Sequence, residues 1–206
     1  MSHDVLQIVK TMDQRDLNLQ LALQCAPLLT GIKISNLLIV DKANKESVIE
    51  MFQETTLSYY VFYESEQKVT FYLYDKTEVS NYLQEASVVE AMKQLGCEAS
   101  DLETILQDIS VKYQSYMKSE GAFPHELGLL LGYPAEDVVG FIVNEGKNYL
   151  YTGYWKVYAN VQETVRLFEQ FKQAKEKVIR MVAKGISIHH ILESYNLKQY
   201  IEQIAV

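Results

Sequence analysis

Four short segments with the residue pattern of β-strands constrain the fold of this chain more than any other feature. Residues 36–40, with the sequence Asn-Leu-Leu-Ile-Val, are a continuous apolar run of the kind found in strands buried on both faces. Segments 57–64 and 68–74 are dense in Tyr, Val and Phe around a polar turn, which predicts a hairpin. Segment 149–158 alternates aromatic and aliphatic residues and predicts one or two further strands.

The sequence between these segments has the apolar spacing of helices. Residues 5–23 predict two short helices or one bent helix, ended by Pro27 and Gly31. Further helices are predicted over 45–56, 78–95, 100–117, 124–131, 134–145, 161–184 and 187–195. We therefore expect an α+β fold with a small, mostly antiparallel sheet of about four or five strands, covered by helices mainly on one face.

The chain has no internal repeat, low-complexity tract or long linker, so we expect one α+β domain over residues 1–206. A soft subdivision near residue 121 is the alternative. With 48% hydrophobic and 22% charged residues, the 206-residue chain can fill a large core.

Composition and charge exclude several classes of partner. The chain has 19 Lys and Arg against 27 Asp and Glu, a formal charge of −8, which argues against broad contact with phosphate backbones. It has neither an apolar run of the roughly 18 residues that span a bilayer nor the features of a signal peptide. Cys25 and Cys97 lack metal or redox spacing and read as reduced thiols. We expect a cytoplasmic protein with no nucleic-acid or membrane partner; a homodimer, a protein partner and a small molecule stay open.

The most distinctive string runs over 124–142 and contains HELG, LGYP and DVVGF, followed by GYWKVY at 153–158. With the earlier elements Cys25-Ala26-Pro27, Gly31-Ile32-Lys33 and Asn36-Leu37, it resembles an uncharacterised bacterial family of Firmicutes type, known as a domain of unknown function. The resemblance covers most of the chain. It implies a cytosolic protein and carries over no catalytic residue.

The same string holds the candidate site. On a helix starting at Pro124, residues His125, Gly128 and Gly132 would share one face. The glycines leave a notch with an imidazole at its end, which admits either a ligand or a close-packed helix, and packing is the commoner reason for such glycines. The candidate ligand-pocket residues are His125, Glu126, Gly128, Tyr133 and Lys156.

A metal site with His125 as a ligand is the other interpretation. The H-E-x-x-H zinc motif is excluded because position 129 is Leu, so ligands would have to come from distant segments. The candidates are Cys25, Glu136, Asp137, His189 and His190. Cys25 could also pair with His125 as a thiolate and imidazole, although a small buried hydrophobe is the commoner role of such a cysteine.

Two functions follow from these patterns. The first is a cytosolic binding or regulatory protein with a small-ligand pocket near residues 124–142. The alternative is a metal-dependent or small-molecule enzyme using His125. The G-x-G-x-x-G, P-loop, G-x-S-x-G and C-x-x-C motifs are absent, so the sequence identifies neither a cofactor nor a catalytic residue.

Overall fold

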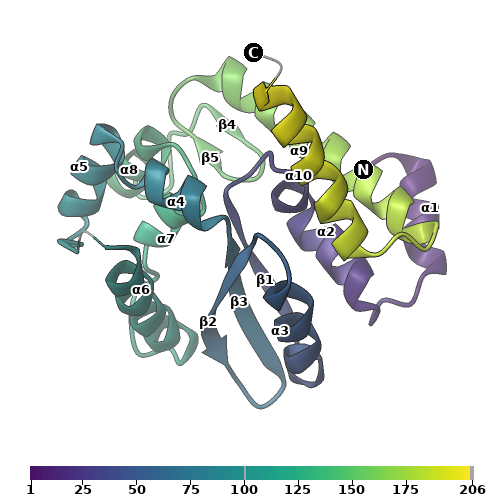
Figure 1. Ribbon diagram of the computed structural model, residues 1–206. Coiled ribbons are helices and arrows are strands. Elements are labelled where there is room, and N and C mark those ends of the chain that lie inside the picture. Colours follow the sequence, from purple (N-terminus) through teal and green to yellow (C-terminus); the bar gives the residue numbers. More distant parts are fainter. Residues whose placement is uncertain (100, 205–206) are drawn as a thin grey trace.

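An antiparallel three-stranded sheet lies at the centre of the molecule (Figure 1). The computed structural model describes residues 1–99 and 101–204, with side chains described as far as residue 196. The strands are β1 (Ser35–Asp41), β2 (Ser58–Glu64) and β3 (Lys68–Tyr74), in the order β1-β3-β2. The predicted strand at 36–40 and the predicted hairpin are therefore confirmed, but β1 is an edge strand whose Ile39 is exposed, not a strand buried on both faces. β3 is the middle strand, and its register with β1 runs from Tyr74 opposite Ser35 to Lys68 opposite Asp41.

Helices cover both faces of this sheet rather than mainly one. Side chains alternate along a strand, and β3 is buried on both faces because both of its side-chain rows are largely apolar or aromatic. On one face Val69, Phe71 and Leu73 belong to a core with residues of the N- and C-terminal helices and α3. These helices are α1 (His3–Thr11), α2 (Leu17–Leu29), α3 (Lys45–Gln53), α9 (Val161–Ala183) and α10 (Ile188–Ile204).

The opposite face of the sheet carries a second core. Tyr72 of β3 stacks on Phe62 of β2, with ring centroids 5.2 Å apart. Phe62 lies where the register of β2 shifts between Val61 and Tyr63, so a bulge accommodates this buried ring. This core is completed by the helices α4 (Lys76–Tyr82), α5 (Ala86–Gln94), α6 (Leu102–Met117), α7 (Glu126–Leu130) and α8 (Ala135–Val143).

Several helix predictions differ in detail from the structure. Pro27, expected to end the first helical segment, lies inside α2, which continues to Leu29. The single helix expected over 78–95 is α4 followed by α5, because Glu85 has extended backbone angles (φ −62°, ψ 134°) at the start of α5. Ser100, expected at the start of the next helix, lies outside the described residues. Asp101 caps α6 instead, and its carboxylate accepts a hydrogen bond of 2.9 Å from the backbone N–H of Thr104.

The remaining two strands form a separate sheet. β4 (Tyr151–Thr152) and β5 (Lys156–Val157) make a short antiparallel hairpin that does not join the central sheet. Trp155 and Val157 instead pack with Phe168 and Phe171 of α9 in a third, small core. The hairpin thus lies between α8 and α9 (Figure 1). The α+β class is confirmed, with the five strands divided between two sheets.

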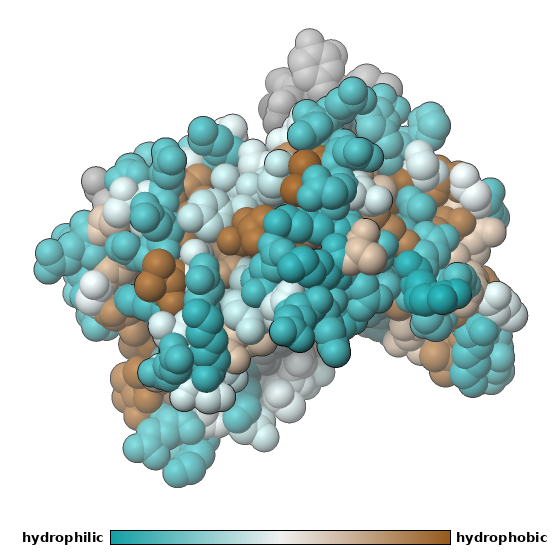
Figure 2. All heavy atoms as spheres, turned by 90° about the horizontal axis from the view of Figure 1, so that it is seen from below, coloured by the Kyte–Doolittle hydropathy of each residue, from teal (hydrophilic) through white to brown (hydrophobic). Residues whose placement is uncertain are grey.

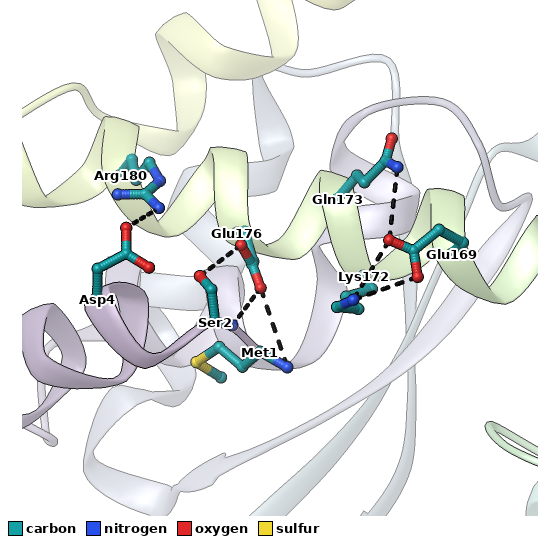
Figure 3. A network of polar contacts seen from close by, with 8 residues as sticks. All are labelled: Met1, Ser2, Asp4, Glu169, Lys172, Gln173, Glu176 and Arg180. Carbon is teal, nitrogen blue, oxygen red and sulfur yellow. Dashed lines mark hydrogen bonds and ion pairs between the residues drawn. The ribbon is translucent and has the colours of Figure 1, made fainter.

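Polar contacts fasten α1 to α9 (Figure 3). Asp4 pairs with Arg180, and the Ser2 hydroxyl donates a hydrogen bond of 2.7 Å to the Glu176 carboxylate. The hydrogen bond from the Arg180 guanidinium holds the pKa of Asp4 at about 2.

A short 3-10 turn, η1 (Lys42–Asn44), follows β1.

The surface at the end where the β2–β3 turn lies is mostly hydrophilic, and its hydrophobic side chains occur in separate small areas (Figure 2). Among the described residues, no helix combines the length and the apolar character needed to cross a bilayer.

Candidate functional site

The helix that carries His125 is much shorter than its sequence pattern suggests. α7 spans only Glu126–Leu130, and His125 occupies its N-cap position. Gly132 lies beyond the helix with φ +72°. The backbone N–H of Gly132 and Tyr133 bond to the carbonyls of Leu129 (2.9 Å) and Gly128 (3.0 Å), which is the Schellman arrangement that ends a helix. The expected helix face shared by His125, Gly128 and Gly132 therefore does not form.

Asp137, in the first turn of α8, holds the β4–β5 hairpin in place. Its side chain is buried, and its Oδ2 accepts a 2.7 Å hydrogen bond from Nε1 of Trp155. Its Oδ1 accepts from the backbone N–H of Tyr158 at 2.7 Å and of Ala159 at 3.1 Å. Donors of the chain itself thus take three of the about four acceptor positions of this carboxylate. Asp137, one of the candidate metal ligands from the sequence, is bonded to the hairpin segment instead.

Trp155 is the centre of an aromatic cluster. Its ring stacks on Tyr133 with centroids 4.5 Å apart and an interplanar angle of 24°. Phe168 of α9 meets the same indole edge-to-face, at 4.5 Å and 86°. The hydrogen bond to Asp137 and these two ring contacts fix the orientation of the indole.

A cavity of about 540 Å³ lies between α7, α8 and the hairpin. Its volume falls in the range of small-molecule sites, and its walls are mainly apolar and aromatic. Of the five pocket residues proposed from the sequence, the structure places His125, Gly128, Tyr133 and Lys156 on its walls. The other side chains that line it are mostly aliphatic or aromatic and include Leu37, Phe123, Leu127, Leu131, Val138, Phe141, Tyr154 and Trp155.

The fifth predicted residue, Glu126, does not line this cavity. Its side chain is buried, on a different side of α7, and forms an ion pair with Lys112 of α6. Neighbouring residues at the start of a helix point in different directions, so His125 and Glu126 cannot both face the same space. Glu126 is therefore a structural residue in this fold.

Residues 21–192 match the family described as "Protein of unknown function (DUF3793)". The chain belongs to this family. No curated protein and no solved structure matches it. The matched range of DUF3793 includes every residue that lines the cavity, and the uncharacterised family expected from the sequence is thereby confirmed.

In this DUF3793 protein, Lys156 places a positive charge in the cavity wall, where a bound ligand can contact it. The Lys156 ammonium donates a 2.7 Å hydrogen bond to the carbonyl of Gly146 and lies 5.0 Å from the ring centroid of Tyr149. An ammonium has three N–H donors, and the backbone carbonyl takes one of them. Since both oxygens of Asp137 are already bonded, Lys156 is the charged wall residue with free hydrogen-bond donors.

His125 makes aromatic rather than polar contacts. Its ring centroid lies 5.7 Å from that of Phe123 and 5.5 Å from that of Phe141. Within the described part of the chain its ring has no hydrogen bond to a carboxylate that would orient it as a base. His125 therefore forms part of an aromatic wall.

Cys25 has the role of a small buried hydrophobe, the commoner of the two roles considered from the sequence, and its alternative pairing with His125 is not formed. Cys25 is completely buried in the core that includes α2 and β1, and it does not line the cavity. Burial raises the pKa of its thiol to about 12, which leaves it protonated and unreactive at neutral pH.

The predicted set of metal ligands is not assembled either. Across residues 1–99 and 101–196, no three His, Cys, Asp or Glu side chains gather in a way that could hold a metal ion. The rings of His189 and His190 lie nearly perpendicular, at 87°, and His190 contacts Ser187.

The wall residues missed by the sequence analysis are mainly Phe123, Phe141 and Trp155. All three lie in or next to the segment that the sequence singled out, so a search for ring-bearing positions around it would have found them.

Proposed function

We propose that this protein is a binding protein for a small organic molecule with a flat apolar body and an acidic group. The observation that carries this proposal is the cavity of about 540 Å³, which combines aromatic walls with the free donors of Lys156. A ring of the ligand would lie among Tyr133, Phe141 and Trp155, where burial of apolar surface supplies most of the affinity.

The acidic group of the ligand would be placed by Lys156. The aromatic rings of Phe141 and Tyr149 lie within 5.6 Å of its ammonium and keep the charge next to a low-polarity surface. A carboxylate or similar anion would make a charge-assisted hydrogen bond there.

Binding without chemistry is the function that the geometry favours. The alternative from the sequence, an enzyme using His125, requires a partner that orients or activates the imidazole. The ring contacts of His125 with Phe123 and Phe141 supply a wall instead.

The test is calorimetric titration with 1-naphthoate and with its neutral analogue 1-naphthamide. We expect 1-naphthoate to bind at least tenfold more tightly than the amide. The variant Lys156→Gln should abolish this difference, and Leu131→Trp, which fills the cavity, should abolish binding of both probes. Lys147→Gln is the matched control, because Lys147 is an exposed lysine of the same region and pairs with Glu145.

Two outcomes would overturn the proposal. One is that neither probe binds to the wild-type chain. The other is that Leu131→Trp binds both probes as tightly as the wild type does.

The cytoplasmic location, the possible homodimer and the lack of a nucleic-acid partner are predictions that accompany this proposal. Native mass spectrometry of untagged protein reports the number of chains in the assembly. The same spectrum shows any retained metabolite or metal as an added mass, so an organic mass would support the binding function and a metal would favour the enzyme.

A further inference from the structure

A second, smaller cavity of about 90 Å³ shares Tyr133, Tyr154 and Trp155 with the larger one. Its other walls come from α2, from the start of the central sheet and from α9. Two of its wall residues are lysines, Lys33 and Lys175, and none is acidic.

Lys33 lies just before β1, in the Gly-Ile-Lys element that the sequence analysis singled out. Its ammonium donates a 3.0 Å hydrogen bond to Oδ1 of Asn36 and lies 5.2 Å from the ring centroid of Tyr133. Neither neighbour carries a negative charge. Burial lowers the pKa of Lys33 to about 8, which shows how little its surroundings compensate its charge.

Lys175 reaches the same cavity from the middle of α9. It is half-buried, and no ion pair joins it to another described residue. The nearest carboxylates along the helix have other partners: Glu169 pairs with Lys172, and Glu176 accepts hydrogen bonds from Ser2 (Figure 3). Burial lowers the pKa of Lys175 as well.

Two partly buried ammonium groups with no carboxylate beside them cost folding free energy unless an anion accompanies them. The shape of the cavity limits that anion. Its volume of about 90 Å³, against about 540 Å³ for the larger cavity, favours a compact anion such as a tetrahedral oxyanion over a nucleotide.

We propose that this cavity binds a free inorganic oxyanion of the size of phosphate or sulfate between the ammonium groups of Lys33 and Lys175. The two lysines donate to its oxygens, and Tyr133 and Trp155 form its apolar wall. The site shares Tyr133 and Trp155 with the organic-ligand site, but its charged residues are different and it does not depend on Lys156.

Trp155 makes the test direct, because it is the single tryptophan of the chain and lines the small cavity. We would titrate the protein with sodium phosphate at constant ionic strength, set with NaCl, and follow Trp155 fluorescence and the melting temperature. Both should change and reach saturation, and sulfate should compete. Lys33→Met and Lys175→Met should each weaken the apparent affinity at least tenfold.

Lys172→Met is the matched control, since Lys172 is an exposed lysine on the same helix. It should bind phosphate like the wild type, and so should Lys156→Gln, which separates this site from the proposed organic-ligand site. The proposal is overturned if chloride reproduces the phosphate effect, or if both Lys→Met variants bind as the wild type does.

A measurement on the wild-type protein alone tests the proposal without relying on any variant. The ³¹P signal of inorganic phosphate should broaden in the presence of the protein and sharpen again when excess sulfate is added. An unchanged line width at millimolar phosphate would also overturn the proposal.

Discussion

At the level of single residues, the larger cavity depends most on Asp137. The carboxylate receives three hydrogen bonds from the hairpin segment, one from the Trp155 ring and two from backbone N–H groups. It therefore satisfies free N–H groups of this segment, as a capping residue does at the end of a helix. A buried acceptor of this kind stabilises the fold only as long as its oxygens face hydrogen-bond donors.

We expect Asp137→Asn to destabilise the protein by about 1–3 kcal/mol, because the amide NH₂ would face an N–H donor. Urea unfolding measures the loss, and the emission of Trp155 should shift to longer wavelength as the hairpin loosens. The control is Glu136→Gln, an exposed neighbour in the same helical turn, which should change stability by no more than about 0.5 kcal/mol. Equal effects of the two substitutions would contradict this role of Asp137.

Lys33 makes stability depend on pH in a defined direction. Its folded pKa is about 8, whereas an unfolded lysine titrates near about 10.4. Between these values the unfolded chain binds more protons than the folded protein. The free-energy cost of burying the charged Lys33 is therefore fully present below pH 8 and decreases as the pH rises.

Buried Cys25 acts in the opposite direction, because its pKa is raised to about 12 and its favourable contribution to stability is lost above about pH 8.5.

In phosphate-free buffer at pH 7, Lys33→Met should therefore be more stable than the wild type by about 1–3 kcal/mol, since each pKa unit corresponds to about 1.4 kcal/mol and the lost hydrogen bond to Asn36 offsets part of the gain. This advantage should shrink as the pH approaches 10. Denaturant unfolding at several pH values measures the difference, and Cys25 cancels because both proteins contain it. A Lys33→Met variant that is less stable at pH 7, or whose advantage does not vary with pH, would contradict the expectation.

At the level of elements, α8 and the residues after β5 approach each other because position 140 has no side chain. A Cβ added to Gly140 would lie 2.6 Å from both Cβ and Cγ of Tyr158, closer than carbon atoms can pack. Glycine usually weakens a helix by about 1 kcal/mol relative to alanine. Here the close contact outweighs that local preference.

Gly140→Ala should lower the free energy of unfolding by about 1–3 kcal/mol, although alanine is the better helix former. Gly128→Ala is the comparison. Its added Cβ would meet a methyl group of Val138 at 3.0 Å and Cδ2 of Tyr133 at 3.5 Å, so only the Val138 side chain would have to shift. Thermal or urea unfolding should rank Gly140→Ala as the more damaging change. A stabilised Gly140→Ala variant would show that the contact with Tyr158 is dispensable.

At the level of the whole molecule, the central sheet connects two cores. Phe71 and Leu73 of β3 belong to one core, and Tyr72 and Tyr74 belong to the other. The hairpin of β4 and β5 adds a further connection, because it bonds to α8 through Asp137 and packs on α9 through Trp155. The walls of the small cavity accordingly come from α2 and α9 on one side of the sheet and from Tyr133, which packs on the core of the other side.

A single domain over residues 1–206, rather than a division near residue 121, stays a prediction that this arrangement supports. Because β3 contributes to both cores, we expect them to unfold together. Urea unfolding followed by Trp155 fluorescence and by far-ultraviolet circular dichroism should give coincident transitions. Two separate transitions would favour the division near residue 121.

The local structure and the family could be predicted from the order of residues alone. Apolar periodicity, glycines and capping residues act over a few positions, so the strands at 36–40, 57–64 and 68–74, most of the helices and the α+β class could be predicted from it. It also pointed to four cavity residues, His125, Gly128, Tyr133 and Lys156, because they lie in one distinctive string.

Which distant faces meet depends on how the elements pack in three dimensions. Spacing along the chain does not show that Glu126 pairs with Lys112, that Asp137 bonds to Trp155, or that the 149–158 hairpin forms its own sheet. These outcomes depend on long-range packing, in which each buried polar group must find its partner and each apolar face must be covered. The two lysines of the small cavity, 142 positions apart in the sequence, come together for the same reason.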